Sequence, residues 1–241
     1  MKTYSRKVPA NTAKEPPFKR LTNKQLAVYY WLVANSRWNS KEQENHYYIY
    51  NSEFTNTQIG KELNIKSRDT VRNALNILET YGYICRLKDY IVIPRAEKIT
   101  YLDVRLIKWL LKQSKVKSVG AEFILFYSIL KRLFEINSKN DKKTDVTPSL
   151  MMKLLGYSPN ETPIYDKFRL YFAIFEHYGL IKLKKNYILN NLGVKCYYFT
   201  LLFISETTTK DCEYNMDYDV KLDEKTINEI ETDLLVDFRS L

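Results

Sequence analysis

Apolar residues recur at helical spacing over long parts of the chain and at alternating spacing over shorter parts. The first helical pattern covers residues 22–36, where Thr22 and Gln25 form a capping-box pair at the start. Its apolar positions are Leu26, Tyr29, Tyr30 and Val33. The aromatic run at residues 47–50 is short and β-prone, and it predicts a strand after this helix.

Residues 55–93 carry the most regular pattern in the chain. Thr55 is placed to cap a short helix that Asn64 can close, and Ser67 is placed to cap a longer helix that ends at Gly82. Two β-prone runs follow, residues 83–86 and 90–93, joined by a three-residue turn. Helix, short helix, turn, longer helix and hairpin in this order predict a winged helix-turn-helix.

The second half of the chain repeats this pattern. Residues 78–84 align with residues 175–181 at an offset of 97, and a long apolar helix is predicted over 119–134. At an offset of 92, Thr55, Ile59 and Leu63 fall on Thr147, Met151 and Leu155. Strands predicted at 180–184 and 196–204 enclose a longer, basic wing that contains Lys184, Lys185, Asn190, Asn191 and Lys195.

These patterns predict an α+β chain, mainly helical, made of two tandem winged-helix domains. Residues 1–20 are polar and basic with three prolines, which favours a flexible arm. The domains are expected over 21–95 and 118–204, with a linker helix in 96–117 whose basic end bridges the domains or forms a dimer contact. Residues 205–241 form an acidic tail with a short amphipathic helix.

The charge of the chain favours a polyanionic partner. The formal net charge is +10, with 38 Lys and Arg against 28 Asp and Glu. The tail holds eleven acids and four bases, so the remainder carries +17 against −7 in the tail. Two interpretations of the tail stay open, a mask over a basic face and a helix docked through Ile227, Ile230, Leu234 and Phe238.

Signatures of catalysis, metal binding and membrane insertion are missing from the sequence. The two histidines, His46 and His177, are not spaced as ligands, and no phosphate-cradling glycine-rich motif is present. The three cysteines show no C-x-x-C spacing, and Cys85 and Cys196 are expected as small core residues. We therefore expect a cytoplasmic protein without catalytic activity, cofactor, metal or membrane contact.

The run from Ser67 to Leu75, continued by Leu78, Glu79 and Gly82, resembles the recognition helix of GntR-type winged helices. The resemblance covers less than a fifth of the chain, and it implies that Arg68, Thr70 and Arg72 face DNA. The helical pattern agrees, because it places Val71, Ala74, Leu75 and Leu78 on one apolar stripe. The residues on the other face are Arg68, Asp69, Arg72, Asn73 and Asn76.

Two basic winged helices in one chain are similar in architecture to plasmid and phage replication initiators. The similarity implies binding to double-stranded DNA at an origin, a homodimer and contacts with other replication proteins. A transcription repressor and a protein-interaction module remain as alternatives. The predicted DNA contacts are Thr55, Lys66, Ser67, Arg68, Thr70, Arg72, Asn73, Arg86 and Lys88 in the first domain, and Lys167, Arg169, Lys184, Lys185 and Lys195 in the second.

Overall fold

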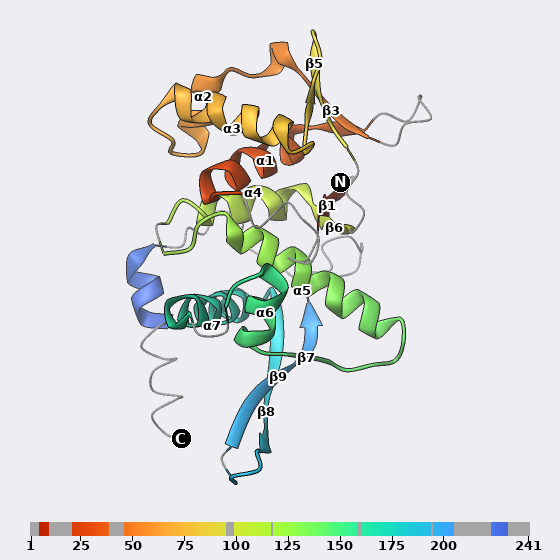
Figure 1. Ribbon diagram of the computed structural model, residues 1–241, viewed down its shortest axis with the longest axis vertical. Helices are drawn as coiled ribbons and strands as arrows, with labels where there is room; N and C mark the ends of the chain where they lie inside the picture. Colours follow the sequence, from red (N-terminus) through yellow and green to blue (C-terminus); the bar gives the residue numbers. More distant parts are fainter. Residues whose placement is uncertain are drawn as a thin grey trace.

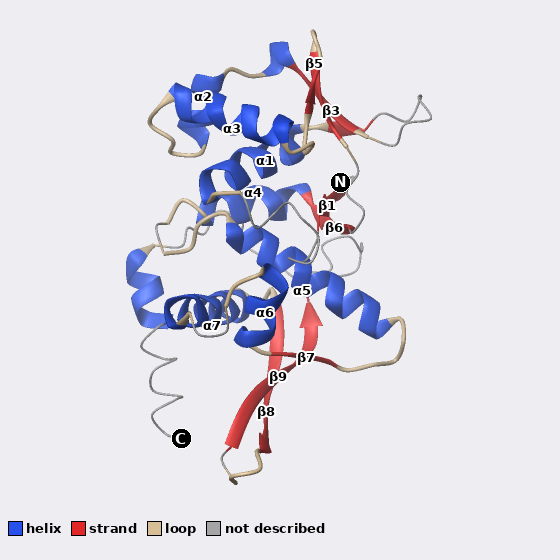
Figure 2. Cartoon of the chain, in the orientation of Figure 1, coloured by secondary structure: helices blue, strands red, loops and turns tan. Residues whose placement is uncertain are grey.

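The computed structural model describes residues 5–9, 21–38, 46–94, 99–116, 118–158, 161–193, 195–204 and 223–230. The chain is α+β and mostly helical, with small antiparallel sheets (Figure 2). Two units follow one another along the chain, and we call residues 21–94 the first unit and residues 118–204 the second unit. No helix among the described residues is long and apolar enough to cross a bilayer.

The first unit begins with helix α1 (Asn23–Asn35) and strands β2 (Arg37–Trp38) and β3 (Tyr47–Tyr50). The one-turn helix η2 (Asn51–Glu53), helix α2 (Asn56–Glu62) and helix α3 (Arg68–Thr80) follow. Strands β4 (Cys85–Arg86) and β5 (Tyr90–Ile93) form a hairpin that completes a sheet of order β2-β3-β5-β4.

The second unit repeats this order of elements. Helix α5 (Glu122–Ser138) precedes strand β7 (Thr144–Val146), helix α6 (Pro148–Leu155) and helix α7 (Thr162–His177). Strands β8 (Ile181–Leu189) and β9 (Lys195–Ile204) form a hairpin much longer than that of the first unit, and the sheet order is β7-β9-β8. In both units the last strand therefore lies between the first strand of the hairpin and the strand that precedes the two helices, β3 or β7.

The same local interactions begin and end the matching helices. The Thr55 hydroxyl accepts from Gln58 N at 3.1 Å, and the Thr147 hydroxyl accepts from Leu150 N at 3.0 Å. Gly82 and Gly179 both adopt positive φ, and each donates its N–H to a glutamate carbonyl, Glu79 or Glu176, at 2.9 Å. The predicted caps at Thr22 and Ser67 and the left-handed Asn64 are also confirmed.

Two segments outside the units differ from the prediction. Strand β1 (Ser5–Pro9) pairs in antiparallel fashion with β6 (Ile99–Asp103), so this part of the expected flexible arm is a strand, and the rest of it lies outside the described residues. The segment expected to hold a linker helix, residues 96–117, contains the strand β6 and then the helix α4 (Val104–Gln113), which Asp103 caps by accepting from Arg105 N. The reason is that β1 pairs with a strand about 90 positions later in the sequence, and local patterns do not predict such pairing.

Helix α4 joins the two units instead of spanning a gap between them. It packs against α1 on one side and α5 on the other (Figure 1). Leu106, Trp109 and Leu110 are buried, and one continuous apolar core runs through both units. Because burial of one such side chain contributes about 1.5–3 kcal/mol, this helix is a structural element of the core.

A polar network also fixes the junction of the units. Asn23 at the start of α1 accepts from Glu122 N at 3.0 Å, across 99 residues of sequence. Glu122 is 7% exposed, and its carboxylate accepts from the hydroxyl of Tyr157 and pairs with Lys167 Nζ at 3.0 Å. Burial raises the pKa of Tyr157, so its hydroxyl stays protonated and remains a donor.

Part of the acidic tail docks on the body of the protein. Residues 224–230 are helical, and Asp223 caps them by accepting from Thr226 N at 2.8 Å. Ile227 and Ile230 are buried in the common core, which favours the docked-helix interpretation for this stretch, whereas Leu234 and Phe238 lie outside the described residues.

Cys85 and Cys196 were expected in the core, and the structure shows both exposed. Cys85 lies on β4, where both residues are exposed, and Cys196 lies near the tip of the β8–β9 hairpin, opposite the exposed Ile188. The apolar sequence around each cysteine therefore gave a wrong prediction of burial. Cys212 lies outside the described residues.

The docked tail gives the first prediction. Ile227→Ala is expected to lower the free energy of unfolding by about 2 kcal/mol, the lower end of the cost for a buried Ile→Ala change, because the site is a short terminal helix. Urea unfolding measures the loss, and Glu229→Ala on the exposed face of the same helix is the matched control. An unchanged free energy of unfolding, together with tighter non-specific DNA binding after removal of the tail, would instead support the mask.

Candidate nucleic-acid interface

A cavity of about 590 Å³ opens on the first unit between α2, α3 and the β4–β5 hairpin. Its floor includes the apolar side chains of Phe54, Leu75 and Ile91. Its other lining residues are polar or basic: Asn51, Thr55, Asn56, Thr57, Arg68, Arg72 and Arg86. Three guanidinium groups lie at one concave site and favour an anionic ligand, although Arg72 and Arg86 each also contact a carboxylate just outside the lining, Asp69 or Glu79.

The exposed face of α3 presents the polar residues that the sequence predicted. Val71, Ala74, Leu75 and Leu78 are buried, and this turns Arg68, Asp69, Arg72, Asn73 and Asn76 toward solvent. Arg72 Nη2 lies 2.8 Å from Asp69 Oδ1, one turn earlier on the same face. Both side chains are more than half exposed, so this ion pair is weak and leaves the guanidinium available to another partner.

The start of α2 and the start of α3 lie at the same cavity. Thr55 and Ser67 act as helix caps, and the Ser67 hydroxyl accepts from Asp69 N at 3.2 Å. Lys66 precedes this cap and is exposed, while Thr70 is half-buried in the first turn of α3. Unpaired N–H groups in the first turn of a helix attract anions, so the two caps are compatible with phosphate contacts nearby.

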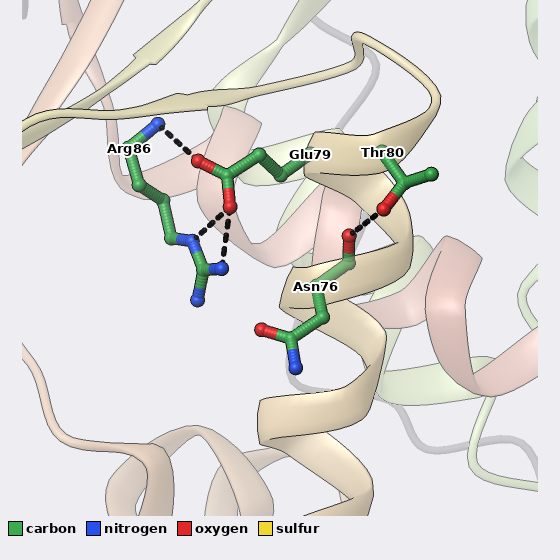
Figure 3. Close-up of polar contacts among 4 residues, drawn as sticks. All are labelled: Asn76, Glu79, Thr80 and Arg86. Atoms are coloured by element: carbon green, nitrogen blue, oxygen red, sulfur yellow. Dashed lines mark hydrogen bonds and ion pairs between the residues drawn. The ribbon is translucent and has the colours of Figure 1, made fainter.

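Arg86 on β4 is tied to the end of α3 (Figure 3). The Glu79 carboxylate accepts from Arg86 N at 3.1 Å and from Arg86 Nε at 2.8 Å, and it also contacts Nη2. These hydrogen bonds hold the pKa of Glu79 below its ordinary value. In the second unit Glu176 accepts from Leu183 N at 3.0 Å, at the same offset of 97 positions. Each unit thus fastens its hairpin to its long helix with a carboxylate.

Asn51 has a role in the site that the sequence reasoning missed. Its side-chain amide donates to the carbonyls of Leu87 and Lys88 at 3.2 and 3.0 Å, and its N–H donates to Asp89 O at 2.9 Å. It thereby fixes the turn that carries the exposed Lys88. Asn56 and Thr57 were missed as well, although a run of polar residues around the predicted cap at Thr55 was a visible signal.

The long helix of the second unit presents a different surface. Helix α7 buries Phe168, Leu170, Tyr171, Phe172, Ile174 and Phe175, so most of its length faces the core. Lys167 pairs with the buried Glu122, and Arg169 Nη1 lies 3.2 Å from Asp166 Oδ1 with its side chain only 20% exposed. These two predicted contacts are therefore held by acidic partners within the chain.

The second hairpin is longer and more regular than the sequence indicated. The first strand was expected to end at Lys184 and the wing to begin there, but β8 continues to Leu189, and Lys184 and Lys185 lie on it opposite Thr200 and Phe199. Lys195 is the first residue of β9, opposite Leu189, so the loop is reduced to residues 190–194. The antiparallel pairing continues to the tip of the hairpin. Neighbouring side chains on a strand point to opposite faces, and both Lys184 and Lys185 are exposed.

Within the part of the chain that the structure describes, no group of three or more His, Cys, Asp or Glu side chains is placed to hold a metal ion. Comparison of the chain with protein-family models, with curated proteins and with solved structures finds no match.

The Glu79–Arg86 contact gives a prediction of pH dependence. Because the folded-state pKa of Glu79 is lowered, the stabilisation is present above the ordinary value of 4.5 and is lost as pH falls through the lowered pKa. Glu79→Gln is expected to cost at most about 1 kcal/mol at pH 7, since both partners are partly exposed to screening solvent, and less at pH 3, where protonation of the carboxyl weakens the ionic contact. Chemical unfolding at both pH values measures this, with Asp89→Asn as control. An equal cost at both pH values would contradict an ionic origin.

Proposed function

We infer that the protein binds double-stranded DNA sequence-specifically, and that the cavity of the first unit is the surface that reads it. The observation that carries this proposal is the exposed polar face of α3, with Arg68 and Arg72 at one concave site beside a hairpin. Arginine and asparagine side chains pair in bidentate fashion with guanine and adenine edges, and a helix of this size fits the major groove.

The proposal includes the fold of both units. The order helix, strand, helix, helix, hairpin, with the last strand in the middle of the sheet, occurs twice and is the order of a winged helix. In this interpretation α3 is the recognition helix of the first unit, and the β4–β5 turn with Lys88 is a wing that contacts the backbone. The second unit binds through its β8–β9 hairpin, since α7 is largely buried.

For the biological role we favour origin recognition in plasmid or phage replication over transcription repression, with no catalytic step. Two winged helices joined by a shared core suit binding at two segments of one site, because the joining helix holds them in fixed register. A nuclease footprint separates the two roles. Several direct repeats indicate an initiator, and one palindrome covered by a dimer indicates a repressor.

The recognition helix gives a prediction about base reading. Arg68→Ala and Arg72→Ala are each expected to cost about 1–3 kcal/mol in binding to the preferred duplex, because each removes a bidentate base contact. The duplex is obtained by selection from a random pool, and binding is measured in competition with a scrambled duplex. Lys139→Ala, an exposed cation at the far end of α5, is the control. Equal losses on both duplexes would reduce these arginines to phosphate contacts.

The second hairpin gives a prediction about salt dependence. Replacing Lys184 and Lys185 with Ala is expected to weaken binding to every duplex alike, and to flatten the plot of log K against log salt by about 0.9 per lost phosphate contact. The matched control removes two exposed lysines elsewhere, Lys139 and Lys142. A slope and an affinity that both stay unchanged would place this hairpin at a protein interface.

A further inference from the structure

The β8–β9 hairpin extends away from the rest of the protein (Figure 1). Its tip exposes apolar side chains. Tyr187, Ile188 and Leu189 at the end of β8 are 54%, 60% and 62% exposed. Leu192 in the turn is 86% exposed, the highest value among the exposed large hydrophobic residues of the described chain. The exposed apolar group is small, and it is confined to the last residues of a long arm.

The turn holds Leu192 at the apex. The Asn190 side chain accepts from Leu192 N at 2.9 Å, and the Asn190 carbonyl accepts from Gly193 N at 2.9 Å. Gly193 has a φ of 73°, which a side chain there would oppose. The strands below the turn are paired without interruption from Leu183–Leu201 to Leu189–Lys195. The leucine therefore lies at the end of a continuously hydrogen-bonded arm.

The arm reaches well beyond the packed part of the sheet. Phe199, opposite Lys185, still packs against Phe172 of α7, with ring centroids 6.0 Å apart. Four further residues of β8 follow Lys185, which extend about 13 Å at 3.3 Å per residue. The minor groove of DNA is about 7.5 Å deep, so the tip can enter a groove while residues nearer the body stay at the phosphates.

The positive charge of this arm favours an anionic partner. No Asp or Glu occurs between Glu176 and Glu206, while four lysines do. Lys182, Lys184 and Lys185 are exposed behind the apolar tip. Lys185 Nζ lies 4.9 Å from the centre of the Tyr197 ring, which faces Tyr187 across the hairpin. Cations behind an aliphatic tip match a ligand with an outer layer of phosphate and an apolar interior of stacked bases.

We propose that the β8–β9 hairpin is a DNA-deforming arm, which inserts Leu192, with Ile188 and Leu189, between neighbouring base pairs and bends the duplex. Proteins that insert aliphatic side chains from the minor groove unstack one base step and kink DNA by about 20–90°. The inference rests on the proposed DNA binding and adds an activity to it. The first unit selects the site, and the arm of the second unit opens the stack beside it.

The test separates deformation from binding. A duplex labelled at its ends with a donor and an acceptor fluorophore reports bending, and 2-aminopurine placed along it reports unstacking. The full-length chain is expected to shorten the end-to-end distance and raise 2-aminopurine fluorescence, and Leu192→Ser is expected to abolish both changes while most of the affinity remains. Leu202→Ser, an exposed leucine on β9 away from the tip, is the matched control and is expected to behave as wild type. Thermal melting verifies that both variants fold.

Each other outcome overturns the inference in a distinguishable way. A wild-type chain that binds the duplex without bending or unstacking it refutes the arm and leaves the proposed DNA binding intact. A chain that binds no duplex at low salt refutes both. Tight binding to vesicles of anionic lipid, lost in Leu192→Ser, would assign the tip to a membrane surface. A change of sedimentation coefficient in Leu192→Ser would assign the tip to self-association.

Discussion

The burial of α4 between α1 and α5 is the constraint on which the rest of the structure depends. Leu106, Trp109 and Leu110 are buried, and the helix that carries them packs against α1 of the first unit and α5 of the second. The two units therefore share one core. As a consequence, the cavity at α3 and the β8–β9 hairpin are held at a fixed separation, and the junction cannot act as a free linker between independent modules.

Polar contacts make one arrangement of this apolar junction specific. Burial of Tyr29, Trp109 and their neighbours would tolerate several arrangements, whereas the bond between Asn23 and Glu122 N fits one. The Glu122 carboxylate is buried, and Tyr157 and Lys167 donate to it from the elements packed around it. A buried charge is stable only with such donors, so removing one of them destabilises more than its own contact.

The two units share a backbone plan and differ in the surfaces built on it. In α3 only one stripe is apolar, and the opposite face is free to carry arginine and asparagine. In α7 the apolar residues surround most of the helix, because it packs under α5 and against the sheet at the same time. In the second unit, the exposed lysines and the exposed apolar residues lie instead on the hairpin, which extends beyond the core.

Local sequence patterns were enough to predict the helices and hairpin of the first unit and the polar face of α3. The caps at Thr22, Thr55 and Ser67, the left-handed Asn64 and Gly82, and the polar face of α3 all depend on residues within a few positions of one another. Short-range hydrogen bonds and helical periodicity depend on residues close together in the sequence, so they can be predicted from it. For this reason the first hairpin and its helix could be predicted together with the arginines they present.

The contacts between distant segments could not be predicted from local patterns. Strand β1 pairs with β6, α4 enters the core, and Lys167 finds Glu122 across 45 residues. The exposure of Cys85 and the docking of residues 224–230 belong to the same class. Whether a basic residue is available to a ligand depends on whether the fold places a carboxylate next to it. That pairing depends on the packing of distant elements, which no local pattern of residues records.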